Sequence, residues 1–380
     1  MPRRHCEGRA GRSEQVALDS VVGQQRVAQL LRRVLHSGRV GHAYLFHGPV
    51  GLGKFLMARE FAKELLCQAV SSPRGAACES CPSCRQVDEL AHPAMRLVLP
   101  SPKEPDPSAE RAILDQLASD PYRVEQILIH PTISIERVRE LRQFAAYAAA
   151  PGQRRVVIVP AADRMSVEAG NSFLKLLEEP PEDMVLILTS SDPNLLPDTI
   201  VSRCHLVRFS PVPEGVLAQT LVARFGVDEE RARLVATLSG GSYAEALAWI
   251  QEDTAMLRYQ AVELLRTALR ALPEQVRFAQ ELAGRSDREA RHRLLAFLHV
   301  LQLWLRDACL VAEFGEQALD LLANRDDLGV IQRFNQNLAF VDYDALFDAL
   351  DEAAFQVRRN VALRLVLLTL IGRVRRSIRR

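Results

Sequence analysis

The chain has 380 residues, 48% of them hydrophobic and 25% charged, with a formal net charge of +1. This length favours two or three domains, and the near balance of charge excludes a global field that would draw the protein onto DNA or an anionic membrane. Contacts with nucleic acid must therefore come from a local patch or through a complex, and no apolar run approaches the roughly 18 residues of a membrane-spanning segment.

The N-terminus and the cysteines indicate the cellular compartment of the protein. Residues 1–16 are basic and polar and lack the apolar core of a signal peptide, so we expect a disordered leader, with organised sequence beginning near Ala17. Seven cysteines occur, and four of them cluster. Without a secretion signal, clustered thiols favour metal binding over a disulfide framework. We therefore expect a cytoplasmic protein.

Strands and helices alternate over residues 17–210. Residues 41–49, GHAYLFHGP, predict a short apolar strand that runs into a Gly-rich turn, and residues 54–68 predict an amphipathic helix. The same patterns predict further helices and buried strands at 133–150, 154–163, 169–181 and 184–192. Unbroken apolar strands separated by helices indicate an α/β domain with a parallel sheet covered on both faces.

The turn after the first strand is nearly a phosphate-binding loop. Gly48, Gly51, Gly53 and Lys54 have the spacing G-x-x-x-x-G-K between a strand and a helix. Backbone N–H groups in such a turn surround phosphates, and the lysine neutralises their charge. Phe55 stands where a Ser or Thr hydroxyl would ligate magnesium. The pattern predicts a degenerate loop in which ATP binding is weak or absent.

A nucleotide hydrolase also needs carboxylates at the end of a neighbouring strand, for magnesium and for the attacking water. The strand of residues 154–159 is followed by Pro160, Ala161 and Ala162, so neither carboxylate is in place. Asp163 comes three residues late, and we expect it to cap the following helix. Because magnesium ligation and water activation are both lost, we predict that the chain does not hydrolyse ATP.

Four cysteines, Cys67, Cys78, Cys81 and Cys84, have the spacing C-x10-C-x2-C-x2-C. Three lie close enough for one tight knuckle, and Cys67, at the end of the preceding helix, can complete a tetrahedron. Four thiolates suit a closed structural zinc site with no open position for catalysis. An iron–sulfur cluster is the rival use of these ligands, but no neighbouring feature indicates redox chemistry.

Three further segments complete the chain. Residues 100–131 are rich in proline and charge and interrupt the α/β pattern; we expect a surface insertion with one helix, and a partner-specific contact is the alternative. Residues 211–253 predict three short helices, and residues 254–380 predict a wholly helical region. The sequence thus predicts three domains, 17–210, 211–253 and 254–380.

Several of these motifs together resemble the clamp-loader ATPase family of AAA+ proteins, in its bacterial DNA polymerase III form. They are DSVVGQ (19–24), the phosphate loop, the cysteine insert, AGNSFLKLLEEPPE (169–182) and LPDTIVSRC (196–204). The resemblance covers roughly residues 17–250, and the remainder fits the family only in length and composition. It implies an AAA+ α/β domain with a zinc module at 67–84, a helical lid domain and an all-α collar domain that mediates oligomerisation.

The family contains motor subunits that hydrolyse ATP and a delta-prime type that usually does not. This chain departs from the motors at Phe55, at Pro160–Ala161 and at Ala244, where motors carry an arginine that senses the γ-phosphate. Arg203, within Ser202–Cys204, matches the motif whose arginine acts on ATP held by the adjacent subunit. The resemblance therefore implies that the residues for the chain's own site are lost, while the residue used on a neighbour's site remains.

We accordingly expect a non-hydrolysing, delta-prime-like structural subunit of the DNA polymerase III clamp loader. The resemblance implies gamma/tau-type and delta-type subunits as partners, with the sliding clamp and primed DNA reached through the complex, in a cytoplasmic, nucleoid-associated replisome without membrane contact. One alternative is an active gamma/tau-like ATPase with degenerate motifs. Another is a protein that retains regulatory nucleotide binding without hydrolysis.

Overall fold

The computed structural model describes residues 17–69, 76–100, 106–128, 132–146, 154–284, 288–338 and 340–379. The predicted leader, residues 1–16, lies outside the described residues. Contacts divide the chain into two units. The first holds the residues up to Thr220 together with Gly241–Glu245, and the second holds Leu221–Gly240 and the residues from Ala246 onward. The domain boundaries expected at 211 and 254 stay predictions.

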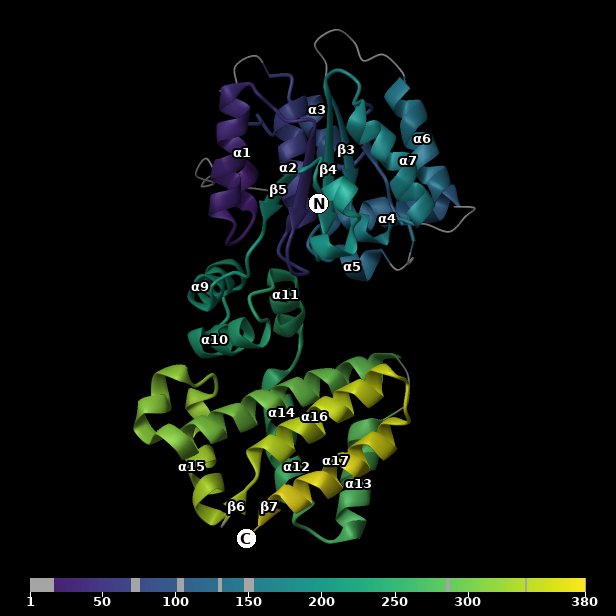
Figure 1. The fold of residues 1–380 in the computed structure, drawn as a ribbon. Helices are drawn as coiled ribbons and strands as arrows, with labels where there is room; N and C mark the ends of the chain where they lie inside the picture. Colours follow the sequence, from purple (N-terminus) through teal and green to yellow (C-terminus); the bar gives the residue numbers. More distant parts are fainter. Residues whose placement is uncertain are drawn as a thin grey trace, which may run out of the picture. The chain divides into compact units, whose positions relative to one another are not determined.

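A five-stranded parallel sheet forms the centre of the first unit, in the order β2-β3-β4-β1-β5 (Figure 1). Its strands are β1 Ala43–His47, β2 Met95–Leu97, β3 Arg155–Val159, β4 Met184–Ser190 and β5 His205–Arg208. All residues of β3 and β4 are buried, as are four of the five in β1. The predicted parallel α/β architecture is confirmed.

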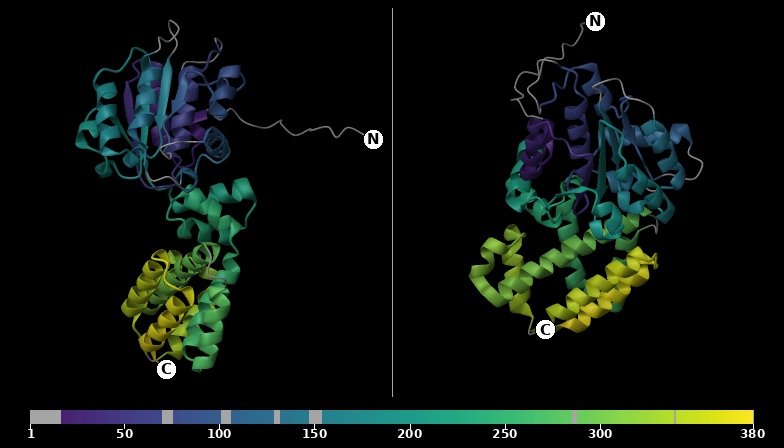
Figure 2. Two further views of the ribbon diagram at one scale, coloured as in Figure 1. Left: turned by 90° about the vertical axis from the view of Figure 1, so that its right-hand side faces the viewer. Right: turned by 45° about the horizontal axis from the view of Figure 1, so that its top comes forward.

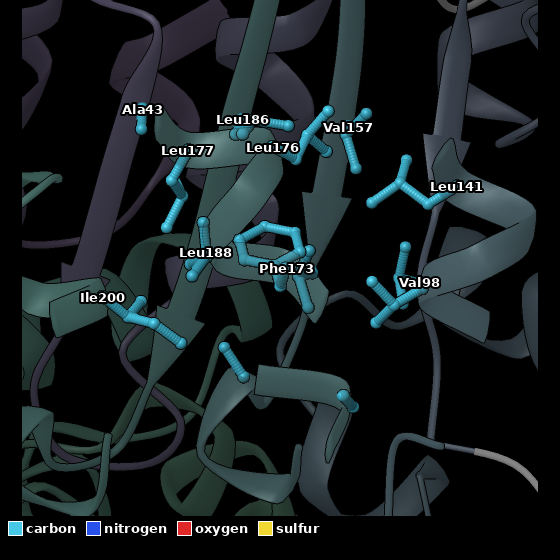
Figure 3. Close-up of a cluster of buried hydrophobic side chains, with 14 of the residues drawn as sticks. Ala43, Val98, Leu141, Val157, Phe173, Leu176, Leu177, Leu186, Leu188 and Ile200 are labelled. Atoms are coloured by element: carbon cyan, nitrogen blue, oxygen red, sulfur yellow. The ribbon is translucent and has the colours of Figure 1, made fainter. Parts of the chain in front are cut away.

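Helices cover both faces of the sheet, which Figure 2 shows from two directions. On one face, α6 (Ile135–Ala146) and α7 (Val167–Glu178) contribute Leu141 and Phe173 to a core with Val157 and Leu186 (Figure 3). On the other face, α2 (Lys54–Leu66) packs Phe61 against Tyr44, with ring centroids 5.4 Å apart. Successive strand residues point to opposite faces, so an unbroken apolar strand supplies both cores.

The remaining elements of the first unit are short. The insertion carries two helices, α4 Pro107–Ser119 and α5 Val124–Ile127, where one was expected. The others are η1 Ala17–Ser20, α1 Gln25–Ser37, α3 Pro82–Asp88, η2 Ala162–Arg164, η3 Pro193–Leu195 and α8 Asp198–Val201. The helices expected over 211–253 are present as α9 Glu214–Phe225, α10 Glu229–Leu238 and α11 Tyr243–Gln251.

The second unit is mostly helical, although residues 254–380 were predicted to be wholly helical and contain a short antiparallel pair of strands, Phe340–Val341 with Ile378–Arg379. Its longest helix, α14 (Arg288–Phe314), carries the fully buried Trp304. Among the described residues, α14 is the one helix long and apolar enough to span a membrane, and 61% of its apolar window is buried in the bundle, as in a core helix. The other elements are α12 Thr254–Ala268, α13 Leu272–Ala283, η4 Gly315–Leu321, η5 Arg325–Asp327, α15 Leu328–Asn337, β6 Phe340–Val341, α16 Tyr343–Arg358, α17 Leu363–Ser377 and β7 Ile378–Arg379.

Candidate functional site

The degenerate phosphate loop lies at the carboxyl end of β1, between β1 and α2. The Gly48 N–H donates to the Ser190 carbonyl of β4 at 3.3 Å, so the loop begins anchored to the sheet. Gly53 is the N-cap of α2 and has φ +83°, a conformation that glycine adopts without strain. The strand–turn–helix geometry expected from the glycine spacing is therefore present.

The Lys54 side chain turns back onto its own loop. Its Nζ donates to the carbonyl oxygens of Gly48 at 2.7 Å and Pro49 at 2.6 Å, and the residue is 5% exposed. Burial lowers the pKa of Lys54, and the negative charges of Glu125 and Asp163 partly offset that effect. The ammonium group is thus satisfied by protein oxygens in this arrangement.

Phe55 fills the position of the missing hydroxyl. Its side chain is 2% exposed, in the first turn of α2. It lines, with Gly51, Gly53, Lys54 and other residues, a cavity of about 10 Å³, bounded further by Pro121, Tyr122, Val124, Glu125 and Thr189. A cavity of this size has room for about one water molecule. This cavity beside the loop is therefore small, and the Phe55 side chain is one of the groups that line it.

The three residues that directly follow β3 carry no carboxylate, and the first carboxylate after the strand is Asp163 in η2, whose charge acts on Lys54. Pro160, Ala161 and Ala162 are buried, and the Ala161 N–H donates to Thr189 Oγ1 at 3.2 Å. The expectation that Asp163 caps the next helix is wrong. Helix α7 begins only at Val167, so Ser166 is its N-cap and accepts from the Ala169 N–H at 3.1 Å.

Residue 244, where a motor would carry a cation, lies directly against the loop. The Ala244 N–H donates to the Gly51 carbonyl at 3.1 Å, and Ala244 is 2% exposed. Its neighbour Tyr243 packs on Tyr122, with ring centroids 4.7 Å apart. The position inferred from the motif is therefore at the loop, and its side chain carries no charge.

Two residues of this site were missed from the sequence. Thr189 is polar and buried at the end of an apolar strand, but one hydroxyl in such a run carries no specific signal. Tyr122 lies in the insertion, which was read as a surface feature, yet it is only 8% exposed. Its hydroxyl accepts from the Val22 N–H at 3.1 Å. That partner is 100 residues away, so no local pattern could indicate the contact.

The four clustered cysteines come together as their spacing predicts. Cys67 ends α2, Cys81 is the N-cap of α3, Cys84 lies within α3, and all four sulfur atoms lie within 4.8 Å of one another. Cys84 Sγ is 3.9 Å from Cys78 Sγ and 3.5 Å from Cys81 Sγ. Four sulfurs at about 2.3 Å from a zinc ion would lie about 3.8 Å apart, so the donor set fits a tetrahedral metal ion.

Backbone donors and a buried histidine support the cysteine cluster. N–H groups of Ser80 and Cys81 lower the pKa of the Cys78 thiol to about 6. The Ala94 N–H donates to His92 Nδ1 at 3.1 Å, so His92 Nε2 carries the proton and donates to Ser83 Oγ at 2.9 Å. Ser83 in turn donates to the Leu66 carbonyl at 2.6 Å. This chain ties the cluster to α2 and to the segment before β2.

Arg203 lies in the turn that precedes β5, away from the loop. Its Nη2 is 3.0 Å from Glu178 Oε1 on α7, and its Nη1 donates to the Thr199 carbonyl at 3.0 Å. The side chain is 38% exposed. Both contacts hold the guanidinium at the surface of the first unit.

Comparison with known proteins places the chain in a family. The sequence model of the family described as "DNA polymerase III, delta subunit" matches residues 23–213. DNA polymerase III subunit delta' of Pseudomonas aeruginosa is 33% identical over 64% of this chain and 65% of its own length. The delta' subunit of Bacillus subtilis is 30% identical over 60% of each chain. This chain therefore spans less than two thirds of the length of these relatives.

Related subunits with other names are also similar to this chain. DNA polymerase III subunit tau of Bacillus subtilis is 26% identical over 62% of this chain and 37% of its own length. A solved structure of a gamma subunit-related protein from Thermotoga maritima covers 92% of this chain and 99% of its own, at 18% identity and a TM-score of 0.40. From the family match and the two delta' relatives, we conclude that the chain belongs to the DNA polymerase III delta-prime family.

Proposed function

We propose that this chain is a non-hydrolysing structural subunit of the DNA polymerase III clamp loader, which acts on ATP held by an adjacent subunit. The position of Arg203 carries the proposal. The loop follows the carboxyl end of β1, whereas Arg203 precedes the amino end of the parallel neighbour β5, where His205 pairs with Tyr44. At about 3.3 Å per residue, the four residues from Tyr44 to Gly48 alone amount to about 13 Å. Arg203 therefore lies at the opposite end of the parallel strands from its own loop.

The surroundings of Arg203 suit a role in trans. Its ion pair with Glu178 joins side chains that are 38% and 50% exposed. Exposed pairs of this kind contribute little stability, so the guanidinium can exchange the carboxylate for a neighbour's phosphate. An arginine supplied to a neighbouring site stabilises the charge that develops on the transferred phosphoryl group.

The filled loop supports the absence of hydrolysis in this chain. Lys54 is bound to loop carbonyls, and Phe55 occupies the sequence position of the magnesium-ligating hydroxyl. The positions directly after β3 are Pro160, Ala161 and Ala162, and Asp163 comes three residues late for the pair of carboxylates that hydrolysis uses. We further propose that the chain is a component of the polymerase III holoenzyme and has no ATPase activity of its own.

The names of the relatives support the choice of partners. Tau and gamma/tau subunits are similar to 62% and 61% of this chain, which supports a complex of related subunits. We propose gamma/tau-type and delta-type subunits as neighbours, with the sliding clamp and primed DNA contacted through the complex. The place of action is then the cytoplasmic, nucleoid-associated replisome.

We also propose that Cys67, Cys78, Cys81 and Cys84 hold one structural zinc ion. All four ligands are thiols, and the fourth corner leaves no open position for a substrate. A bound zinc would cross-link the end of α2 to the start of α3. The role of these residues is to hold the metal and fix that segment.

One observation favours the alternative of an active gamma/tau-like ATPase. The chain is 32% identical to a gamma/tau subunit of Mycobacterium tuberculosis over 61% of its length, close to its identity with the delta' relatives. A measurement of ATP hydrolysis distinguishes the structural subunit from the active ATPase. We expect no ATP turnover by the purified chain, and restored clamp loading when it joins gamma/tau-type and delta-type subunits. Turnover by the chain alone would favour the ATPase, and a complex that loads clamps equally well without the chain would refute the subunit role.

A further inference from the structure

The insertion of residues 100–131 has no counterpart in the proposed chemistry, yet one part of it lies on the phosphate loop. Tyr122, between α4 and α5, packs so closely on Gly53 that a Cβ added there would lie 2.7 Å from its Cε1 atom. The Tyr122 hydroxyl accepts the Val22 N–H, and its ring packs on Tyr243. One side chain thus joins the segment before α1, the loop and the start of α11.

A negative charge from the same segment accompanies the ring. Glu125, in the first turn of α5, lines the cavity of about 10 Å³ together with Lys54. Its charge acts on the Lys54 ammonium, which is otherwise held by two loop carbonyls. A bound nucleotide would offer its phosphates to the glycine turn and to the lysine. In this chain the Tyr122 ring covers Gly53 and the Glu125 carboxylate supplies negative charge toward Lys54.

We propose that the segment Pro121–Glu125 is an internal occupant of the degenerate nucleotide pocket, with Tyr122 as the group that closes it. The inference rests on the proposed loss of nucleotide chemistry at this loop and assigns a role to the insertion. An occupant that belongs to the chain loses no translational freedom on binding, so it holds the loop closed at any nucleotide concentration. The loop retains its turn because it has a permanent partner.

The lysines of the chain provide a direct probe of this closure. The sequence has only four, at positions 54, 63, 103 and 175. Pyridoxal phosphate carries both an aldehyde and a phosphate; its aldehyde condenses with a free amine with loss of water, and borohydride reduces the imine to a stable amine. Lys175 is exposed and serves as the internal reference, whereas Lys54 is buried. Labelling is read for each lysine by peptide mass spectrometry.

In the full wild-type chain, we expect labelling of Lys175 and protection of Lys54. Tyr122→Ala should raise labelling of Lys54 relative to Lys175 by about tenfold or more, because removal of the ring opens the loop locally. Tyr122→Leu tests the same point with a bulkier apolar side chain if the alanine variant does not fold. Tyr122→Phe, which keeps the ring, should leave Lys54 protected. Tyr259→Ala changes an exposed tyrosine on α12 and is the matched control.

Two results would overturn the inference. One is labelling of Lys54 in the wild-type chain to the same extent as Lys175. The other is unchanged protection of Lys54 in the folded Tyr122 variants, which would show that the ring does not close the loop. The second result leaves the proposed function standing, since that proposal fails only through ATP turnover by the chain or through clamp loading that does not need it.

Discussion

At the scale of single residues, Phe55 shows how one substitution can change what a loop does. A hydroxyl at this position is small and polar and faces a bound ion, whereas the Phe55 ring is 2% exposed and belongs to the core. Replacing a buried phenylalanine with a small residue costs about 3–5 kcal/mol. We therefore expect that a Ser or Thr placed at position 55 would supply a hydroxyl but would destabilise the domain.

Arg203 is the residue whose loss should affect the complex without affecting the chain. We expect Arg203→Ala to lower ATP turnover of the reconstituted complex at least about tenfold, since arginine fingers in other systems contribute roughly 10³–10⁵ to the rate. Assembly should be unchanged, because the exposed pair with Glu178 contributes little. Turnover is measured by phosphate release and assembly by size-exclusion chromatography.

Arg111→Ala is the matched control for this experiment. Arg111 also forms an exposed ion pair in the first unit, with Asp115 at 2.9 Å. It lies on α4, away from the turn that holds Arg203. Equal turnover in the wild-type and Arg203→Ala complexes would remove the role in trans.

Glu64 on α2 gives the stability of the chain a dependence on pH. Burial, and then the charge of Glu60, raises the pKa of Glu64 to about 7 from 4.5. Because the folded state holds the proton more tightly, this group's contribution to stability is full below pH 4.5 and is lost as pH rises to about 7. Glu64→Gln should therefore be more stable than the wild-type chain at pH 8, as measured by denaturant unfolding.

The advantage of Glu64→Gln should shrink as pH falls from 8 to 5, since the wild-type carboxyl then becomes neutral. Glu230→Gln is the control, because Glu230 is exposed on α10. A difference between Glu64→Gln and the wild-type chain that stays constant over this range would contradict the assignment.

At the scale of elements, the proposed zinc site predicts that the segment around the cysteine cluster depends on metal for its order. Helix α3 has seven residues, and only Ser83, Cys84 and Val87 are buried in it. So little apolar area cannot order a short helix by itself. Metal binding in small zinc modules contributes on the order of 10 kcal/mol to folding, enough to fix a segment of this size.

We therefore expect about one zinc ion per purified chain, as four thiolates require. Cys84→Ser should remove the metal and speed hydrogen exchange over residues 76–88, while the sheet of the first unit stays protected. Metal content is measured by atomic emission and exchange by mass spectrometry. Cys309→Ser, on α14 and outside the cluster, should retain the zinc. A folded wild-type chain that binds no metal would contradict the site.

The elements also show where sequence reasoning reaches its limit. Parallel strands, the glycine turn and the cysteine knuckle follow from local spacing, and the structure has them. The place of Ala244 was inferred from the resemblance to the family, and Ala244 lies against the loop. The helix start at Ser166 rather than Asp163 was missed because both residue types cap helices equally well. Tyr122 was missed for a different reason. Its partner Val22 is 100 residues away, and contacts of that separation leave no periodic trace in one sequence.

At the scale of the whole molecule, the filled loop predicts that ATP with magnesium does not stabilise the chain. A ligand that binds only the folded state adds RT ln(1 + [L]/Kd), about 2.7 kcal/mol at a hundredfold excess over Kd. The cavity of about 10 Å³ beside Lys54 and Phe55 admits no phosphate group. We expect equal unfolding temperatures with and without ATP and magnesium, with a gamma/tau-type subunit as the positive control.

The same measurement separates the three functions that the sequence left open. An active ATPase predicts that ATP raises the unfolding temperature only with magnesium, because its metal ligands act together with the phosphates. Regulatory binding predicts a rise in unfolding temperature that persists in EDTA, since the glycine turn and Lys54 can hold an anion without metal. A structural subunit predicts no change in unfolding temperature in either condition. Because Lys54 already has two carbonyl partners and Tyr122 already covers Gly53, an incoming phosphate would have to displace both groups before it gained any contact.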